Sequence, residues 1–243
     1  MGGVTVSLFF YMVVEEPVSK SKRRSLYDWW RDRFGGQSPL QRRLPISDVL
    51  GSSHSMPLSV EVRGKHSTYL TPDAEAFVEL LGIDLIMNFT NAILRGPILT
   101  LPTHGVWSFH HGNPREFRGA PPGFWEIYYD APWSGAILQR LEERLDDGIV
   151  LRSARLPTIA HSYSKQREQL FSASIHWPAE VAKELVNGAT LPSSNPEPPS
   201  NAPITRNPTN LQTLYFWLKL LKAKIRRFVC RTGSRSGADD ETN

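Results

Sequence analysis

The sequence predicts an α/β protein with a Rossmann-like, mostly parallel sheet, flanking helices, a linker and a C-terminal amphipathic helix. Three observations predict it. Apolar, β-branched runs alternate with segments that have helical caps and stops. The chain of 243 residues is long enough for one such domain and an appendage. A stretch rich in Pro, Ser and Asn then precedes a segment with an apolar repeat of three and four residues.

The individual elements follow from local signals. The expected strands span residues 4–14, 83–89, 106–110, 133–141 and 149–152. The expected helices span 25–34, 72–81 and 160–186, with a short helical turn near 97–101. Ser25, Thr71 and either Ser162 or Ser164 are expected to cap the helices, because their side-chain oxygens can accept from the first free N–H groups. Residues 35–60 contain many turn formers and predict irregular structure.

These elements divide the chain into four parts. Residues 1–186 are expected to form the α/β domain, 187–208 a linker without a core, 209–229 an amphipathic helix and 230–243 a disordered tail. The apolar stripe of the helix consists of Leu211, Leu214, Leu218, Leu221, Ile225 and Phe228. We expect this stripe to dock on the α/β domain or on a further domain. A helix that lies on a membrane surface is the less favoured alternative.

Composition excludes several classes of protein. The net charge of +4 is modest and the basic residues gather in local runs, so a nucleic-acid partner is not favoured. Cys230 is the single cysteine, which excludes an internal disulfide framework and a cysteine-rich zinc site. The histidines lack metal-ligand spacing, so no metal site is expected. No signal-peptide pattern precedes or follows the apolar start, and a cytoplasmic location is expected.

One group of motifs suggests acid/base chemistry. The motifs are Ser108-Phe109-His110, Arg118-Gly119-Ala120-Pro121-Pro122 and Leu145-Asp146-Asp147-Gly148. Residues two apart in a strand point to the same side, so Ser108 and His110 are expected to face one cleft, and His111 to face away from it. A histidine can move protons near neutral pH, and a carboxylate beside it can fix its tautomer. Taken singly, each motif has an ordinary structural explanation, such as a turn at Asp-x-Gly.

In this order and spacing, the motifs resemble the core of the folate-dependent formyltransferases. That family carries Asn-x-His, then Arg-Gly-x-x-Pro, then Leu-Asp-x-Gly, and residues 108–148 match this pattern without a gap. The resemblance implies that His110 and Asp146 are the catalytic pair, with Asp147 the weaker candidate. It places Ser108 where the family has an asparagine that stabilises the oxyanion. Ile93 and Leu94 fall where the family contacts the folate pteridine, largely through backbone groups.

The resemblance implies formyl transfer from 10-formyltetrahydrofolate to an amine. A small amine such as an amino sugar is the favoured acceptor, because residues 112–115 replace the family's usual Ser-Leu-Leu-Pro loop. The C-terminal part also does not resemble the tRNA-binding barrel of the methionyl-tRNA enzyme. A formyltetrahydrofolate hydrolase of the same family and a non-catalytic binding or scaffold homologue are the alternatives. The sequence does not give the oligomeric state.

A second departure from the family lies at the start of the chain. Residues 4–14 match the family's second strand better than its first, so the first strand and helix are expected to be missing. A truncated gene model, a degenerate homologue and a rebuilt sheet edge all stay open as explanations. A sheet without its central strand would expose unpaired edges.

Overall fold

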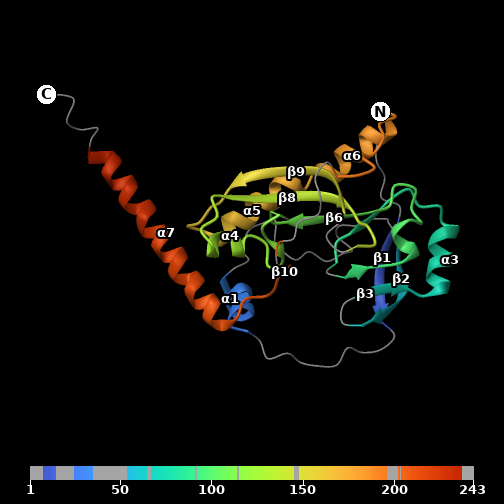
Figure 1. Cartoon of the computed structure of the whole chain (residues 1–243), viewed down its shortest axis with the longest axis horizontal. Helices are drawn as coiled ribbons and strands as arrows, with labels where there is room; N and C mark the ends of the chain where they lie inside the picture. The colour runs from blue at the N-terminus through green and yellow to red at the C-terminus, as the bar shows by residue number, and fades with distance from the viewer. Residues whose placement is uncertain are drawn as a thin grey trace.

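A computed structural model describes residues 8–14, 25–34, 54–64, 67–90, 92–113, 115–144, 148–195, 202 and 204–236 (Figure 1). The strands are β1 (Leu8–Val14), β2 (His54–Arg63), β3 (Ser67–Leu70), β4 (Ile86–Asn88), β5 (Ile93–Leu94), β6 (Val106–His111), β7 (Arg118–Gly119), β8 (Trp133–Arg140), β9 (Ile149–Pro157) and β10 (Ile204–Thr205). The helices are α1 (Leu26–Phe34), α3 (Pro72–Leu80), the 3-10 turn η2 (Pro97–Leu99), α4 (Phe124–Tyr128), α5 (Tyr163–Ser174), α6 (Trp177–Val186) and α7 (Asn210–Ser236).

The first sheet has the strand order β1-β2-β3-β5. Strands β1 and β2 are parallel, β2 and β3 antiparallel, and β3 and β5 parallel. Helix α3 packs on this sheet through Ala74 and Val78, which join Val60 and Leu70 in one apolar cluster. Thr71 caps the helix, because its side chain accepts from the Ala74 N–H. This sheet therefore has its own core.

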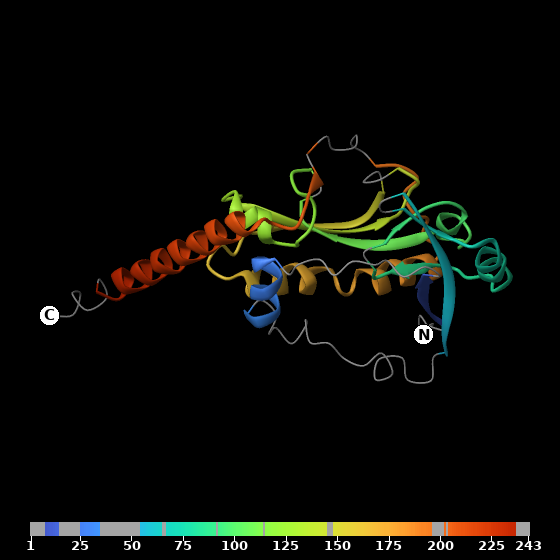
Figure 2. The same cartoon turned by 90° about the horizontal axis from the view of Figure 1, so that it is seen from below.

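The second sheet has the order β4-β6-β8-β9 and carries the candidate catalytic strand β6. Strands β4 and β6 are parallel, whereas β6 with β8 and β8 with β9 are antiparallel. Helices α5 and α6 run along one side of this sheet (Figure 2). Val181 of α6 packs with Trp107 and Leu138, both fully buried. The side of β6 that α5 and α6 do not cover is therefore the candidate side for a functional site.

A third core is aromatic and joins α1, α4 and α7. Phe124 and Phe216 stack with ring centroids 4.1 Å apart, and both are fully buried. Tyr27 and Tyr163 share a buried hydroxyl–hydroxyl hydrogen bond of 2.9 Å. Because α7 supplies Phe216 to this core, its N-terminal part is anchored to the rest of the fold.

The predicted α/β class with parallel strands and flanking helices is confirmed, and both large sheets are mixed. The helix predictions over 25–34 and 72–81 are confirmed. The irregular structure expected at 35–60 is wrong at 54–60, which belongs to β2. The expected helix 160–186 is two helices, since Pro178 begins a new one after the turn at Ile175 and His176.

The C-terminal expectations need two corrections. Helix α7 extends to Ser236, so the part of the predicted disordered tail up to that residue is helical. The stripe of Leu211, Leu214, Leu218, Leu221, Ile225 and Phe228 is exposed and does not dock on the α/β domain. Thr213, Phe216 and Leu220 are buried there instead. The face of α7 that carries Phe216 docks instead, because its large planar ring stacks on Phe124.

The predicted linker, 187–208, contacts the α/β domain at several points. The Asn195 side chain accepts from the Val150 N–H at 2.8 Å and donates to the Gly148 carbonyl at 2.9 Å. Strand β10 pairs in parallel with β7. Among the helices of the described segments, none is long and apolar enough to cross a membrane.

Candidate active site

Strand β6 places Ser108 and His110 on one side of the second sheet. In the register, Ser108 lies between Asn88 of β4 and Gln139 of β8, and His110 lies opposite Ile137. The alternate residues Trp107 and His111 point toward α6 and α5 instead. The strand alternation therefore separates the two candidate residues from the helix-covered core, as the sequence predicted.

Ser108 is half-buried and its hydroxyl is already engaged. Its Oγ donates to the backbone carbonyl of Asn88 at 3.2 Å. A serine hydroxyl has one proton, so Ser108 would have to leave this carbonyl in order to donate to an oxyanion. In this geometry Ser108 can accept a hydrogen bond from a ligand more readily than it can donate one.

His110 is half-buried, and its ring donates from Nε2 to the carbonyl of Phe117 at 3.2 Å. A carbonyl only accepts, so the tautomer in this contact carries its proton on Nε2. Gly112 approaches this nitrogen closely. A Cβ added to Gly112 would stand 3.4 Å from His110 Nε2, 3.2 Å from the Phe117 carbonyl and 3.6 Å from Glu126 Oε1. These three polar atoms therefore all lie close to Gly112.

Glu126 is the functional candidate that the sequence analysis missed. It lies in the apolar helix α4, is only 1% exposed, and its Oε1 has no hydrogen-bond partner among the described residues. Burial, reinforced by the negative charge of Glu116, raises the pKa of Glu126 to about 7. A lone glutamate inside the run Phe-Trp-Glu-Ile-Tyr was the available signal, since a carboxylate is rarely buried without a reason.

The predicted folate positions, Ile93 and Leu94, form strand β5 at the end of the first sheet. Two contacts connect this strand to the site. The Asn88 side chain donates to the Ala92 carbonyl at 3.4 Å, and the Gly96 N–H donates to the Glu143 carboxylate at 3.0 Å. The segments on either side of β5 therefore reach both Ser108's neighbouring strand and the loop that follows β8.

Asp146 lies outside the described residues, together with Leu145 and Asp147. The residue that follows this gap is close to the site. A Cβ added to Gly148 would stand 2.7 Å from Gln139 Oε1, and Gln139 is the register partner of Ser108. The structure thus brings together Ser108, His110 and the approach to β5, while the position of the Asp146 carboxylate stays a prediction.

The comparisons with known proteins agree with the motifs. Over 90 residues, 37% of this chain, the sequence is 34% identical to a methionyl-tRNA formyltransferase of Xanthomonas oryzae pv. oryzae and covers 29% of that protein. Over 149 residues, 61% of this chain, it is 26% identical to a methionyl-tRNA formyltransferase of Rhizorhabdus wittichii and covers 44% of it. The chain is thus similar to methionyl-tRNA formyltransferases over part of its length. It spans less than half the length of these two relatives.

The other comparisons are more distant. A solved formyltetrahydrofolate deformylase from Pseudomonas syringae pv. tomato superposes with a TM-score of 0.48 at 15% identity, covering 79% of this chain and 65% of that one. No protein-family model matches the chain.

The Arg118-Gly119 motif has a structural role of its own. The two residues form β7, which pairs with β10, and the Arg118 guanidinium donates to the Ala202 carbonyl at 3.0 Å. Gly119 has φ 138°, and a Cβ there would stand 2.1 Å from the Thr205 carbonyl oxygen. Only glycine permits this close approach, so the motif allows β10 to lie beside β7.

His111 is a core residue in the structure, consistent with the expectation that it faces away from the cleft. Its Nε2 lies 2.9 Å from the Ser174 hydroxyl of α5, and its ring packs at 4.3 Å from the ring of Phe171. Burial, together with the charges of His110 and Arg167, lowers the pKa of His111 to about 4. The ring is therefore neutral at physiological pH.

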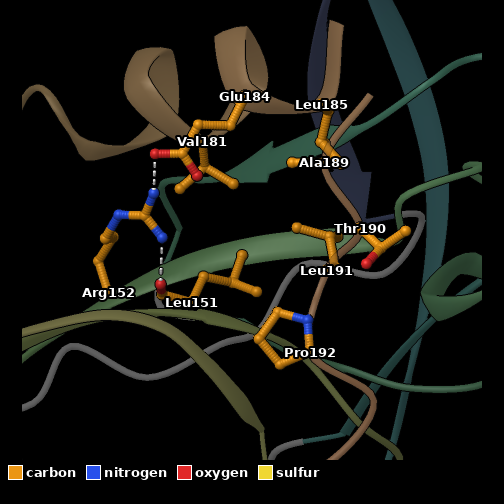
Figure 3. Close-up of a pocket in the computed structure, with 9 residues that line it drawn as sticks. All are labelled: Leu151, Arg152, Val181, Glu184, Leu185, Ala189, Thr190, Leu191 and Pro192. Atoms are coloured by element: carbon orange, nitrogen blue, oxygen red, sulfur yellow. Dashed lines mark hydrogen bonds and ion pairs between the residues drawn. The ribbon is translucent and has the colours of Figure 1, made fainter. Parts of the chain in front are cut away.

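A small cleft lies between β9 and α6 (Figure 3). It is lined mainly by aliphatic side chains, among them Leu151, Val181 and Leu185. Arg152 forms an ion pair with Glu184 at its edge and donates to the Leu151 carbonyl at 2.7 Å. Val181 belongs to the core on the helix side of the sheet, so this cleft lies on the opposite side from His110. Across the described residues, no three His, Cys, Asp or Glu side chains gather as metal ligands would.

Proposed function

We propose that this chain carries the catalytic region of an enzyme that transfers a formyl group from 10-formyltetrahydrofolate to a small amine, such as an amino sugar. The observation that carries the proposal is that His110 Nε2 and Glu126 Oε1 both lie beside Gly112, at the end of the strand that also presents Ser108. The relationship to formyltransferases supplies the reaction class.

The proposed reaction makes one bond and breaks another. The amine nitrogen attacks the formyl carbon, the carbonyl oxygen becomes an oxyanion, and the bond from that carbon to N10 of the folate then breaks. One proton moves from the attacking amine to the departing N10. His110 is the proposed proton carrier, because a histidine gains and loses a proton near neutral pH. Asp146 is proposed to hold the ring and stabilise its charged form.

Glu126 adds a second titrating group to this proposal. With a pKa of about 7, its carboxyl group is partly protonated at neutral pH and can either give or take a proton. Its Oε1 and the His110 Nε2 both lie beside Gly112. We therefore assign Glu126 the role of exchanging protons with His110 between turnovers, directly or through one water.

Strand β5 offers a backbone edge for the folate. It is the terminal strand of its sheet and pairs on one side with β3, through Ser67–Ile93 and Thr68–Leu94. The N–H and C=O groups of a strand edge can pair with a flat ring that carries donors and acceptors, as a pteridine does. Both side chains, Ile93 and Leu94, are half-buried and can pack against such a ring.

A two-step experiment tests the proposal. Calorimetry first measures binding of a stable folate analogue to the wild-type chain, and separate assays then follow formyl transfer to an amine and release of free formate. We expect folate binding together with transfer to the amine. Formate release without transfer would instead show the hydrolase, and no folate binding would show a non-catalytic homologue. His111→Phe is a suitable control, because that ring lies on the other side of β6.

A further inference from the structure

Helix α7 has two apolar faces, and only one of them is used by the fold. Thr213, Phe216 and Leu220 are buried against α1 and α4. The stripe defined by the leucines is exposed: Leu211 by 76%, Leu214 by 46%, Leu218 by 63%, Leu221 by 55%, Ile225 by 55% and Phe228 by 70%. An exposed row of this size needs an explanation, since scattered apolar residues are ordinary on a surface and a continuous row is not.

The stripe is continuous along the helix. Its members recur at steps of three and four residues, so they follow one line down the helix surface. With a rise of 1.5 Å per residue, the line from Leu211 to Phe228 is about 26 Å long. At 100° per residue it lies roughly opposite Phe216 and Leu220. Both views show α7 leaving the domain and projecting past it, so the C-terminal part of the stripe extends beyond the body (Figures 1 and 2).

The charges beside the stripe have one sign. Residues 210–236 contain no Asp or Glu and seven basic residues, which are Lys219, Lys222, Lys224, Arg226, Arg227, Arg231 and Arg235. Lys222 and Arg226 follow one side of the stripe, and Lys224 follows the other. Lys219 forms an ion pair with Asp130 of the domain. The surface that covers this helix must therefore offer hydrocarbon in the middle and negative charge on both sides.

A second copy of the chain meets only half of this requirement. The spacing of the stripe would suit a two-stranded coiled coil, but the positions beside its seam include Lys222 and Lys224 in each copy. Stable coiled coils place opposite charges at those positions, and here no acidic partner exists on the helix. Nucleic acid would satisfy the charges and leave the aliphatic stripe in water. A lipid bilayer with anionic headgroups satisfies both.

We propose that α7 lies flat on an anionic membrane surface, with the leucine stripe at the boundary of headgroups and acyl chains. The Lys and Arg side chains on either side then reach the lipid phosphates. Because Phe216 and Leu220 stay buried in the aromatic core, the helix brings the whole domain to the surface. This proposal is independent of the formyl-transfer proposal.

Sedimentation of the full chain with vesicles tests it. We expect binding to vesicles of phosphatidylcholine mixed with phosphatidylglycerol, and little binding to phosphatidylcholine alone. The variant Lys222→Gln, Lys224→Gln and Arg226→Gln should bind the anionic vesicles about a hundredfold more weakly, since each basic residue near the surface contributes a factor of about five. The variant Leu218→Ser, Leu221→Ser and Ile225→Ser should lose binding as well.

A matched control tests whether vesicle binding depends on the leucine stripe or on exposed apolar residues in general. Leu80, Ile175 and Val186 are exposed apolar residues outside α7, and replacing all three by Ser should leave vesicle binding unchanged. Circular dichroism checks that each variant keeps its helical content. Equal binding to neutral and anionic vesicles, or none to either, would overturn the proposal. So would a dimer in light scattering that only the stripe variant abolishes, because the stripe would then cover a second copy.

Discussion

The adjacent histidines His110 and His111 lie on opposite faces of strand β6, in different environments. His111 is enclosed by Phe109 and Phe171 on the helix-covered side, and its lowered pKa of about 4 keeps it neutral. His110 lies on the other side, where its Nε2 and a buried carboxyl group with a pKa of about 7 both lie beside Gly112. One residue step along a strand therefore converts a core histidine into a candidate proton carrier, because the layer covering each face sets the environment.

The largest effect is expected from removing the proton carrier. His110→Ala should lower the turnover of formyl transfer by two or more orders of magnitude, the usual contribution of a general acid/base group, and Asp146→Ala should do the same. His111→Phe should leave turnover nearly unchanged. Single-turnover kinetics with the formyl donor and an amine measure this difference. Full activity of His110→Ala would remove the functional contrast between the two faces.

Because of Glu126, the free energy of unfolding should fall as the pH rises from about 4.5 through 7. Its folded pKa of about 7 is above the ordinary 4.5, so its contribution is fully present below about pH 4.5 and is lost as the pH rises through 7. Glu126→Gln should therefore increase the free energy of unfolding by up to about 3 kcal/mol at pH 8, and have little effect near pH 5. Denaturant titration at both pH values checks this.

The exposed Glu79→Gln of α3 is the matched control for that titration, because Glu79 does not contribute to the raised pKa of Glu126. It should change the free energy of unfolding far less at either pH. A Glu126→Gln variant that is equally or less stable than wild type at pH 8 would show that the buried carboxyl group is satisfied in solution. The environment proposed for the His110 face would then be wrong.

His111 should produce a pH effect of the opposite sign. Its folded pKa of about 4 is below the ordinary 6.5, so its contribution is present above pH 6.5 and is lost as the pH falls toward 4. The His111→Phe variant should lose this part of the acid sensitivity, about 3 kcal/mol between pH 6.5 and 4. Thermal unfolding across that range measures it. An unchanged pH profile would mean that His111 is protonated in the folded state.

The smallest effect is expected at Ser108. Ser108→Asn introduces the residue type of the formyltransferases that the chain resembles. In the wild-type chain the Ser108 hydroxyl donates to the Asn88 carbonyl, and Gln139 lies opposite in the register. We expect the larger side chain to be neutral or harmful, changing turnover by less than about tenfold. Steady-state kinetics of the variant decide this. A clear gain in turnover would show that the site has degenerated around serine.

Several of these contrasts could be predicted before the structure was known. The alternation of a strand correctly separates Ser108 and His110 from His111, because side-chain direction follows from the backbone alone. The caps at Ser25 and Thr71 are also local features and are confirmed. Glu126 could not be assigned in this way. Its burial depends on how α4 packs beside β6, and its neighbours at Gly112 are fourteen positions away in the sequence.

Helix α7 also shows what local sequence patterns can and cannot predict. Its apolar spacing and its basic flanks are properties of the sequence, and they predict an amphipathic helix without reference to anything else. The spacing could not tell which face docks, because Phe216 and Leu220 lie outside the leucine stripe. Stacking of Phe216 on Phe124 decided that question, a contact between residues 92 positions apart.

The sequence by itself determined the local periods, the caps, the motif order and the resemblance to formyltransferases. These depend on neighbouring residues and on the 2.0 and 3.6 residue repeats of strands and helices. The tertiary structure alone decided which faces are covered, that β10 pairs with β7, and that Glu126 is buried close to Gly112. The reason is physical. Burial, and with it every shifted pKa described above, depends on contacts between distant segments that no local pattern encodes.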